Sequence, residues 1–310
     1  MRKIDIGNVG LMCSEISLGC MRMAGHTTAE IAQLVDTAIN CGINFFDHAD
    51  IYGRAVGPGE SERIFAQAVK ELGIKRDALV LQSKCGIVPG VMYDFSKEHI
   101  LTSVESSLKR LNTDYLDILL LHRPDTLMDI DEVAEAFKTL YDTQKVRYFG
   151  VSNHNALQMQ LVAQAVPGKI VANQLQLSLT NTSMIDCGLN VNRTEDAAIN
   201  RDDSILEYCR LNKITIQAWS PFQSSKIKGV FLNHAKYPKL NKEINELAQQ
   251  KGVTDTAIAV AWILRHPANI QVIVGTTNKE RLAQMTKATN TMLTREEWYK
   301  LYCAAGNVLP

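Results

Sequence analysis

Residues 115–121, Tyr-Leu-Asp-Ile-Leu-Leu-Leu, and the segment that follows them decide the fold. The seven residues form a short and mostly apolar run, which is typical of a strand buried on both faces. A helical pattern then opens at Asp129 and places apolar residues on one face at a period of about 3.6 residues, namely Val133, Ala136, Phe137 and Leu140. A strand followed by an amphipathic helix is the repeating unit of a parallel α/β fold.

This strand-then-helix unit occurs eight times along the chain. The expected strands are residues 16–19, 43–46, 79–83, 115–121, 146–151, 170–175, 214–218 and 270–274. The first helix opens at Thr27, where Glu30 completes a capping box. Strict alternation implies parallel strands joined by right-handed crossovers, and eight units favour a closed (β/α)8 barrel over an open doubly wound sheet.

Three segments lie outside these units. Residues 3–6 and 11–13, on either side of Gly7-Asn8, predict a hairpin that covers the bottom of the barrel. Residues 176–200 predict a long polar loop over the active face, and residues 298–302 belong to an expected extra helix at the C-terminus. The fold class is therefore α/β, a (β/α)8 TIM barrel with an N-terminal hairpin and a C-terminal helix.

Composition excludes several classes of protein. Lys plus Arg and Asp plus Glu number 33 each, so the net charge is zero and we expect no surface that binds nucleic acid. No apolar run approaches the ~20 residues of a membrane span and no secretory signal is evident, so we expect a cytoplasmic protein that binds no membrane. The seven cysteines form no C-x-x-C pair, which predicts neither a disulfide framework nor a metal site. Length alone suggests about two domains, but without a linker we expect a single domain over residues 1–310.

The carboxyl ends of the expected strands carry ionisable side chains. Asp47, Lys84 and His122 end three consecutive strands, and Tyr52 follows Asp47 by five residues. Adjacent strands lie about 4.8 Å apart, so the four side chains can reach one point on the face where barrel enzymes place their chemistry. Each residue alone is commonly structural, as a cap, a rim charge or a core histidine, but their convergence favours catalysis.

These four side chains suit a proton transfer. A tyrosine hydroxyl, with a pKa of about 10, is a poor acid at neutral pH. A neighbouring ammonium would lower that pKa, and Asp47 would keep the ammonium of Lys84 charged. Tyr52 would then protonate the alkoxide formed when hydride attacks a carbonyl, while His122 polarises the carbonyl oxygen.

Several motifs resemble those of the aldo-keto reductases, in the family's order and over essentially the whole chain. They are Phe46-Asp47-His48-Ala49-Asp50-Ile51-Tyr52-Gly53, Ser83-Lys84, Leu120-Leu121-His122-Arg123-Pro124-Asp125, Gly150-Val151-Ser152-Asn153, Asn173-Gln174, Gln217-Ala218-Trp219-Ser220-Pro221, residues 261–267 and Gly275-Thr276-Thr277-Asn278. The resemblance implies a barrel that reduces aldehydes and ketones with NADPH. The implied catalytic tetrad is Asp47, Tyr52, Lys84 and His122.

The resemblance also implies a cofactor site for NADP(H). No G-x-G-x-x-G motif follows a strand, so a Rossmann site is not predicted. Ser152, Asn153 and Gln174 match the family's contacts to the nicotinamide carboxamide, and Trp219, next to Ser220, matches the aromatic that stacks on the ring. Gly275-Thr276-Thr277 are expected to begin the helix after the eighth strand, whose N–H groups suit a phosphate, and Arg281 matches the contact to the 2′-phosphate. Gly275 replaces a lysine common in the family. The 2′-phosphate, which distinguishes NADP from NAD, therefore has one cationic contact fewer.

Three functions remain open at this point. The first is NADPH-dependent reduction of a small-molecule carbonyl substrate by a monomer or weak oligomer. The second is an NADP(H)-binding redox-sensing or regulatory module with little turnover, and the third is a lyase that uses Lys84 as a Schiff base. The complete tetrad favours the first. Two cofactor residues also have a structural alternative. Trp219 could be an aromatic of the core, and Arg281 could be a surface charge without a ligand.

Overall fold

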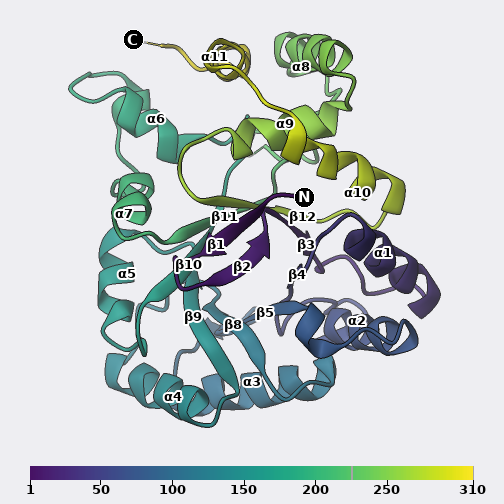
Figure 1. Cartoon of the computed structure of the whole chain (residues 1–310). Helices are drawn as coiled ribbons and strands as arrows, with labels where there is room; N and C mark the ends of the chain where they lie inside the picture. Colours follow the sequence, from purple (N-terminus) through teal and green to yellow (C-terminus); the bar gives the residue numbers. More distant parts are fainter. Residues whose placement is uncertain (225, 310) are drawn as a thin grey trace.

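Eight parallel strands close into a barrel in the computed structural model, which describes residues 1–224 and 226–309 (Figure 1). Around the barrel these are β3 (Ile16–Gly19), β4 (Phe45–Asp47), β5 (Val80–Cys85), β8 (Leu116–Leu121), β9 (Val146–Ser152), β10 (Ile170–Gln176), β11 (Thr215–Trp219) and β12 (Ile270–Val274). Pairing of β12 with β3 closes the ring. The predicted (β/α)8 fold is confirmed, and each strand lies within about two residues of its expected place.

Helices cover the outside of the barrel. They are α1 (Thr28–Asn40), α2 (Glu60–Glu71), α3 (Lys97–Leu111), α4 (Ile130–Asp142), α5 (Ala156–Ala163), α7 (Ile205–Leu211), α8 (Pro238–Lys251), α9 (Asp255–Leu264) and α10 (Lys279–Thr286). Short 3-10 turns add η1 (Arg76–Ala78) and η3 (Lys287–Asn290). Thr27 and Glu30 form the predicted capping box of α1, and Asp129 caps α4 as expected. Most of their buried apolar residues join one large cluster between the helices and the sheet.

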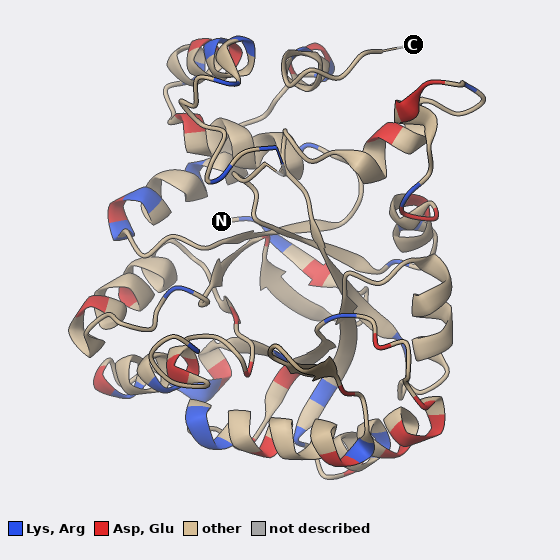
Figure 2. Cartoon of the chain, turned by 180° about the vertical axis from the view of Figure 1, so that it is seen from behind, with Lys and Arg blue, Asp and Glu red and all other residues tan. Residues whose placement is uncertain are grey.

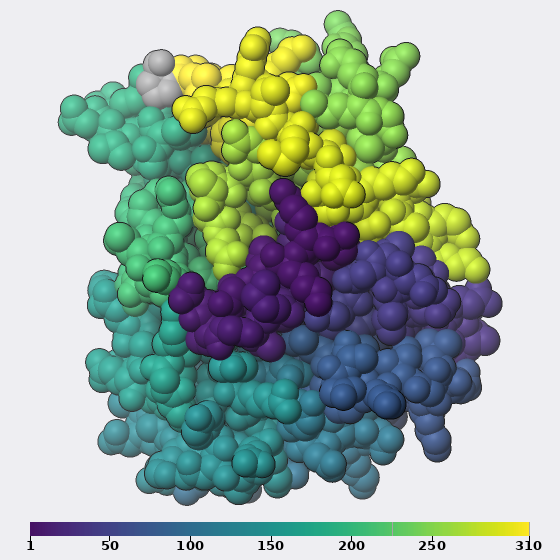
Figure 3. Space-filling view, in the orientation of Figure 1, coloured from purple at the N-terminus to yellow at the C-terminus, as the bar shows by residue number. Residues whose placement is uncertain are grey.

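A hairpin of β1 (Lys3–Ile6) and β2 (Leu11–Ser14) closes one end of the barrel, as predicted (Figure 3). Its fully buried Ile6 and Cys13 pack against Phe45 and other side chains inside the barrel. The backbone N–H of Gly7 donates to Thr215 Oγ1 at 2.8 Å, which fixes the turn against the barrel wall. The other end, seen from behind in Figure 2, carries the loops that follow the strands.

Residues 176–200 are not the plain loop over the active face that the sequence predicted. It contains α6 (Ser183–Leu189) and η2 (Asp196–Ala198), and Asp186 Oδ1 accepts from the hydroxyl of Tyr302 at 2.7 Å. The segment thus packs toward the C-terminal helix and contributes no side chain to the cleft described below. A helix of seven residues is too short for its period to be detected. A small hairpin of β6 (Ile87–Val88) and β7 (Met92–Tyr93) was likewise not predicted.

The extra C-terminal helix is present as α11 (Arg295–Ala304). The rings of Trp262 and Trp298 stack at 4.8 Å, and each indole N–H donates to the other residue's carbonyl. These two buried aromatics hold α11 against α9. Within the described part of the chain, no helix is both long and apolar enough to span a membrane.

The hairpin turn offers a test of how tightly it plugs the barrel. Gly7 and Gly10 both have positive φ, at 63° and 82°. A Cβ at Gly7 would lie 2.6 Å from Val171 Cα, whereas one at Gly10 would meet nothing within 4 Å. We expect Gly7→Ala to lower the free energy of unfolding by about 2–4 kcal/mol and Gly10→Ala by about 1 kcal/mol, measured by urea denaturation. Equal losses would contradict a close contact between hairpin and barrel.

Candidate active site

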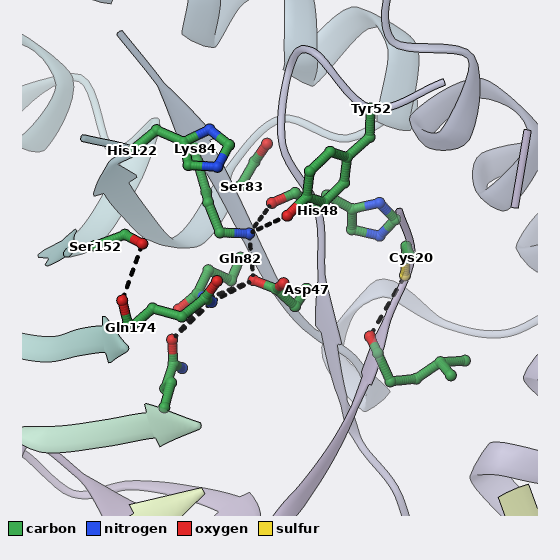
Figure 4. A network of polar contacts seen from close by, with 12 residues as sticks. Cys20, Asp47, His48, Tyr52, Gln82, Ser83, Lys84, His122, Ser152 and Gln174 are labelled. Carbon is green, nitrogen blue, oxygen red and sulfur yellow. Dashed lines mark hydrogen bonds and ion pairs between the residues drawn. The ribbon is translucent and has the colours of Figure 1, made fainter. Parts of the chain in front are cut away.

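Lys84 lies at the centre of the site, with its side chain buried inside the open end of the barrel. Its Nζ is 2.7 Å from Asp47 Oδ1, 2.6 Å from the carbonyl oxygen of His48 and 3.2 Å from the hydroxyl of Tyr52 (Figure 4). These acceptors match the three N–H groups of an ammonium. Burial opposes the charge, but Asp47 and Tyr52 outweigh it and raise the pKa of Lys84 above its usual value.

The proton of Tyr52 is held more firmly than expected. Burial raises the pKa of Tyr52 above its ordinary value and outweighs the ammonium of Lys84, which lowers it. The expectation of a net lowered pKa is therefore wrong, because the sequence indicates the neighbouring charge but not the loss of water around the phenol. As a result Tyr52 is a phenol at neutral pH and is suited to donate a proton.

His122 faces Tyr52 across the site. Their ring centroids are 6.1 Å apart and the ring planes are nearly perpendicular. Burial, together with the positive charges of Lys84 and Arg123, lowers the pKa of His122 to about 3. The imidazole is therefore neutral, and a neutral imidazole has one N–H to offer to a carbonyl oxygen.

A cleft of about 900 Å³ opens above these residues. Every residue predicted for the site lines it except Lys84, which lies beneath; the lining members are Asp47, Tyr52, His122, Ser152, Asn153, Gln174, Trp219, Ser220, Gly275, Thr276, Thr277 and Arg281. This volume is at the upper end of the range for small-molecule sites, so the cleft has room for more than a small substrate.

Comparison with known proteins identifies the family. The sequence profile of the Aldo/keto reductase family matches residues 15–302. The chain belongs to the aldo-keto reductase family. It is 34% identical to the uncharacterized oxidoreductase YcsN of Bacillus subtilis over 98% of both chains, and 32% identical to a 6-dehydroglucose reductase of Agrobacterium fabrum over 95% of both. It also resembles the crystal structure of an aldo-keto reductase from Klebsiella pneumoniae in complex with NADPH, with a TM-score of 0.76 and 25% identity over 97% of this chain and 93% of that one.

In this aldo-keto reductase, the residues expected around a nicotinamide are linked to one another. Asn153 Nδ2 donates to Ser152 Oγ at 2.8 Å, and Ser152 Oγ donates to the carbonyl of Gln174 at 3.0 Å. The indole N–H of Trp219 donates to Asn153 Oδ1 at 3.2 Å. Asn153 and Ser220 both have positive φ, at 60° and 51°, a conformation that costs a non-glycine residue about 1 kcal/mol. These contacts hold amide and hydroxyl groups at the cleft, which fits a carboxamide ligand.

The other end of the cleft suits a phosphate. Helix α10 begins at Lys279, after Asn278, whose Oδ1 accepts from the N–H of Arg281 at 2.6 Å. Residues 275–277 thus form a loop before the helix, and the expectation that they begin it is wrong because Asn278 provides the cap. The first N–H groups of a helix and a nearby guanidinium together favour an anion.

Arg22 lines the cleft but is not among the residues predicted for the cofactor. It follows β3 and donates from Nη1 to the carbonyl of Gly275 at 3.2 Å. A cation therefore lies beside the position where the family's common lysine is replaced by glycine. No motif indicated this contact with Gly275, because the two residues are brought together only by closure of the barrel.

Two residues next to the tetrad lie behind it. The ring of His48 packs edge-on to Phe65 at 4.6 Å, and burial, followed by the charge of Lys84, lowers its pKa to about 3. The thiol of Cys85 is buried, and burial raises its pKa well above the usual value, so it lacks the thiolate character of a reactive cysteine. Over residues 1–224 and 226–309, no group of three or more His, Cys, Asp or Glu side chains could hold a metal ion.

A chain of four buried glutamines extends from Asp47 toward the plugged end of the barrel. Gln82 and Gln174 each donate from Nε2 to Asp47 Oδ1, at 2.6 and 3.0 Å, and to Gln217 Oε1, at 2.8 and 3.3 Å. Gln217 then donates to Gln271 Oε1 at 3.0 Å, and Gln271 to the carbonyl of Ser14 on the hairpin at 2.8 Å. The available signal was a polar residue inside otherwise apolar strands, as in Ile216-Gln217-Ala218.

This glutamine chain predicts that a residue remote from the cleft affects turnover. Gln217→Leu removes the acceptor shared by Gln82 and Gln174, so Asp47 loses two oriented neighbours. We expect the free energy of unfolding to fall by about 1–3 kcal/mol, and aldehyde turnover with NADPH to fall by roughly tenfold. Gln249→Leu, at an exposed position on α8, is the matched control and should change neither. A loss of stability with unchanged kcat would mean that the chain only supports the fold.

Proposed function

We propose that this protein reduces aldehydes or ketones to alcohols with NADPH. The observation that carries the proposal is the buried ammonium of Lys84, which joins the protonated hydroxyl of Tyr52 to the carboxylate of Asp47. Neutral His122 faces the ring of Tyr52 from across the site. A proton donor and a second hydrogen-bond donor thus converge on one place at the cleft, which is the requirement for protonating a carbonyl oxygen.

Each member of the tetrad has a defined role in this proposal. The cofactor, when bound, supplies a hydride to the carbonyl carbon. Tyr52 transfers its proton to the carbonyl oxygen, and the ammonium of Lys84 stabilises the phenolate that remains until solvent returns a proton. Asp47 keeps Lys84 charged and aimed, and the N–H of His122 orients the carbonyl.

The cofactor residues divide between the two ends of the cleft. Ser152, Asn153 and Gln174 would hold the carboxamide, with Trp219 against the nicotinamide ring and Ser220 beside it. At the other end the loop Gly275-Thr276-Thr277, Arg281 and Arg22 would hold phosphate. The amide-rich end and the cationic end support a ligand with the polarity of a phosphorylated nicotinamide dinucleotide.

Two alternative functions are less well supported. A Schiff-base lyase needs a neutral amine, but Lys84 has a raised pKa and three acceptors around its Nζ. Borohydride trapping should therefore give no adduct at Lys84. A cofactor-binding module without turnover would have no need for a proton donor in contact with an ammonium.

The pH dependence of turnover follows from the raised pKa of Tyr52 and the lowered pKa of His122. Tyr52 must be protonated to reduce a carbonyl, and its pKa is raised, so kcat/KM for reduction should stay level from pH 6 to 9 and fall only above the ordinary phenol pKa of about 10. His122, with a pKa of about 3, adds no transition between pH 5 and 8. Alcohol oxidation needs the phenolate and should rise with pH instead. A fall in reduction centred near pH 7 would contradict these roles.

Tyr52→Phe separates a reductase from a binding module. Without the hydroxyl we expect kcat for an aldehyde to fall by about 100-fold or more, since general acid catalysis contributes roughly 10²–10⁴. NADPH affinity, measured by protein fluorescence, should change by less than about threefold. Undiminished turnover in this variant would overturn the proposed role of Tyr52.

Cofactor choice is tested at Arg281. Arg281→Met removes a cation that only a 2′-phosphate would need, so the ratio of kcat/KM for NADPH over NADH should fall by about tenfold, as expected for one charge-assisted contact. Lys279→Met on the same helix is the control, because Lys279 Nζ donates to Gln33 Oε1, a residue outside the cleft. An equal effect of both variants would indicate a general loss of charge rather than a specific contact.

A further inference from the structure

The cleft has an excess of positive charge. Four arginines line it, namely Arg22, Arg54, Arg123 and Arg281. Its carboxylates are Asp47, which is paired with Lys84, and Asp255, which accepts from Asn233 Nδ2 at 3.0 Å. Among the described residues, none of the four guanidinium groups forms an ion pair. A concave site with unpaired charge of one sign concentrates ligands of the other sign.

These arginines belong to two different ends of the cleft. Arg281 and Arg22 lie beside the loop at Gly275, where the phosphates of a dinucleotide account for them. Arg54 follows Tyr52 by two residues, and Arg123 follows His122 directly. Both line the cleft, and each is close in sequence to a residue proposed to act on the carbonyl. A nicotinamide ring carries no negative charge, so this part of the cofactor offers these two arginines no anionic partner.

The loops that carry Arg54 and Arg123 are held by hydrogen bonds from backbone N–H groups. The N–H of Tyr52 donates to the carbonyl of Ala49 at 3.0 Å, which forms a turn just before Arg54. After Arg123, the carboxylate of Asp125 accepts from the N–H groups of Phe95 and Leu127 at 3.1 and 2.9 Å. The charge of Arg123 also reaches the reacting groups, since it contributes to the lowered pKa of His122.

We infer that the carbonyl substrate carries an anionic group, a carboxylate or a phosphate, which Arg54 and Arg123 bind while Tyr52 and His122 act on its carbonyl. The planar guanidinium fork suits both oxyanions, which it can bind with two parallel hydrogen bonds. Ile51, Pro89 and Phe222 line the same cleft and suit a short carbon chain between the two groups. The inference rests on the proposed reductase function and names its substrate class.

Matched substrate pairs test the inference. Succinic semialdehyde is compared with its methyl ester, and glyceraldehyde 3-phosphate with glyceraldehyde, at saturating NADPH. We expect kcat/KM to favour the anionic member of one pair by at least about tenfold, and which pair it is identifies the carboxylate or the phosphate. Arg54→Gln and Arg123→Gln should each reduce that ratio by about five- to twentyfold, and 0.5 M NaCl should reduce it as well.

Arg295→Gln is the matched control, because Arg295 is exposed on α11, away from the cleft. It should leave the ratio unchanged. If the wild-type protein reduces both members of each pair equally well, the inference is overturned while the reductase function stands. An unchanged ratio in the Arg54 and Arg123 variants, combined with weaker NADPH binding by fluorescence titration, would assign these arginines to the cofactor instead. If no aldehyde consumes NADPH, the reductase function itself fails.

Discussion

The rest of the site depends on one buried ammonium ion. An isolated charge inside a protein is very costly, and Lys84 is tolerated there because a carboxylate, a carbonyl and a phenol take up its three N–H groups. This requirement fixes where Asp47 and Tyr52 lie relative to β5. The hydroxyl of Tyr52 therefore has two roles. It accepts a hydrogen bond from the buried ammonium, and its own proton is influenced by that charge.

The barrel was predictable because its strands and helices alternate strictly. The apolar run at 115–121, followed by the helix that Asp129 caps, needed no tertiary information, and Asp47, Lys84 and His122 were found because parallel strands in a barrel end on the same face. The residue types at those ends indicated proton transfer, and the order of the motifs indicated the family. These inferences use local periodicity and one rule of topology.

What could not be predicted depends on burial and on contacts between distant strands. The pKa of Tyr52 is set by how much water the fold excludes, and the sequence indicates only which charges are near. The glutamine chain joins β5, β10, β11 and β12, and Arg22 meets Gly275 across 253 positions in the chain, so neither forms a local pattern. The helix in residues 183–189 was missed because a segment of seven residues is too short to show a helical period.

The hairpin plug has a kinetic consequence. Because it closes one end of the barrel, a cofactor and a substrate must share a single entrance at the other. Gln174 and Ser152, which we propose hold the carboxamide, are buried, whereas Arg54 and Arg123 are exposed. A ligand that contacts the deeper residues would then arrive first and depart last. The shape of the cleft would then impose a fixed order of binding. Release of the oxidised dinucleotide would be the slowest step of the cycle.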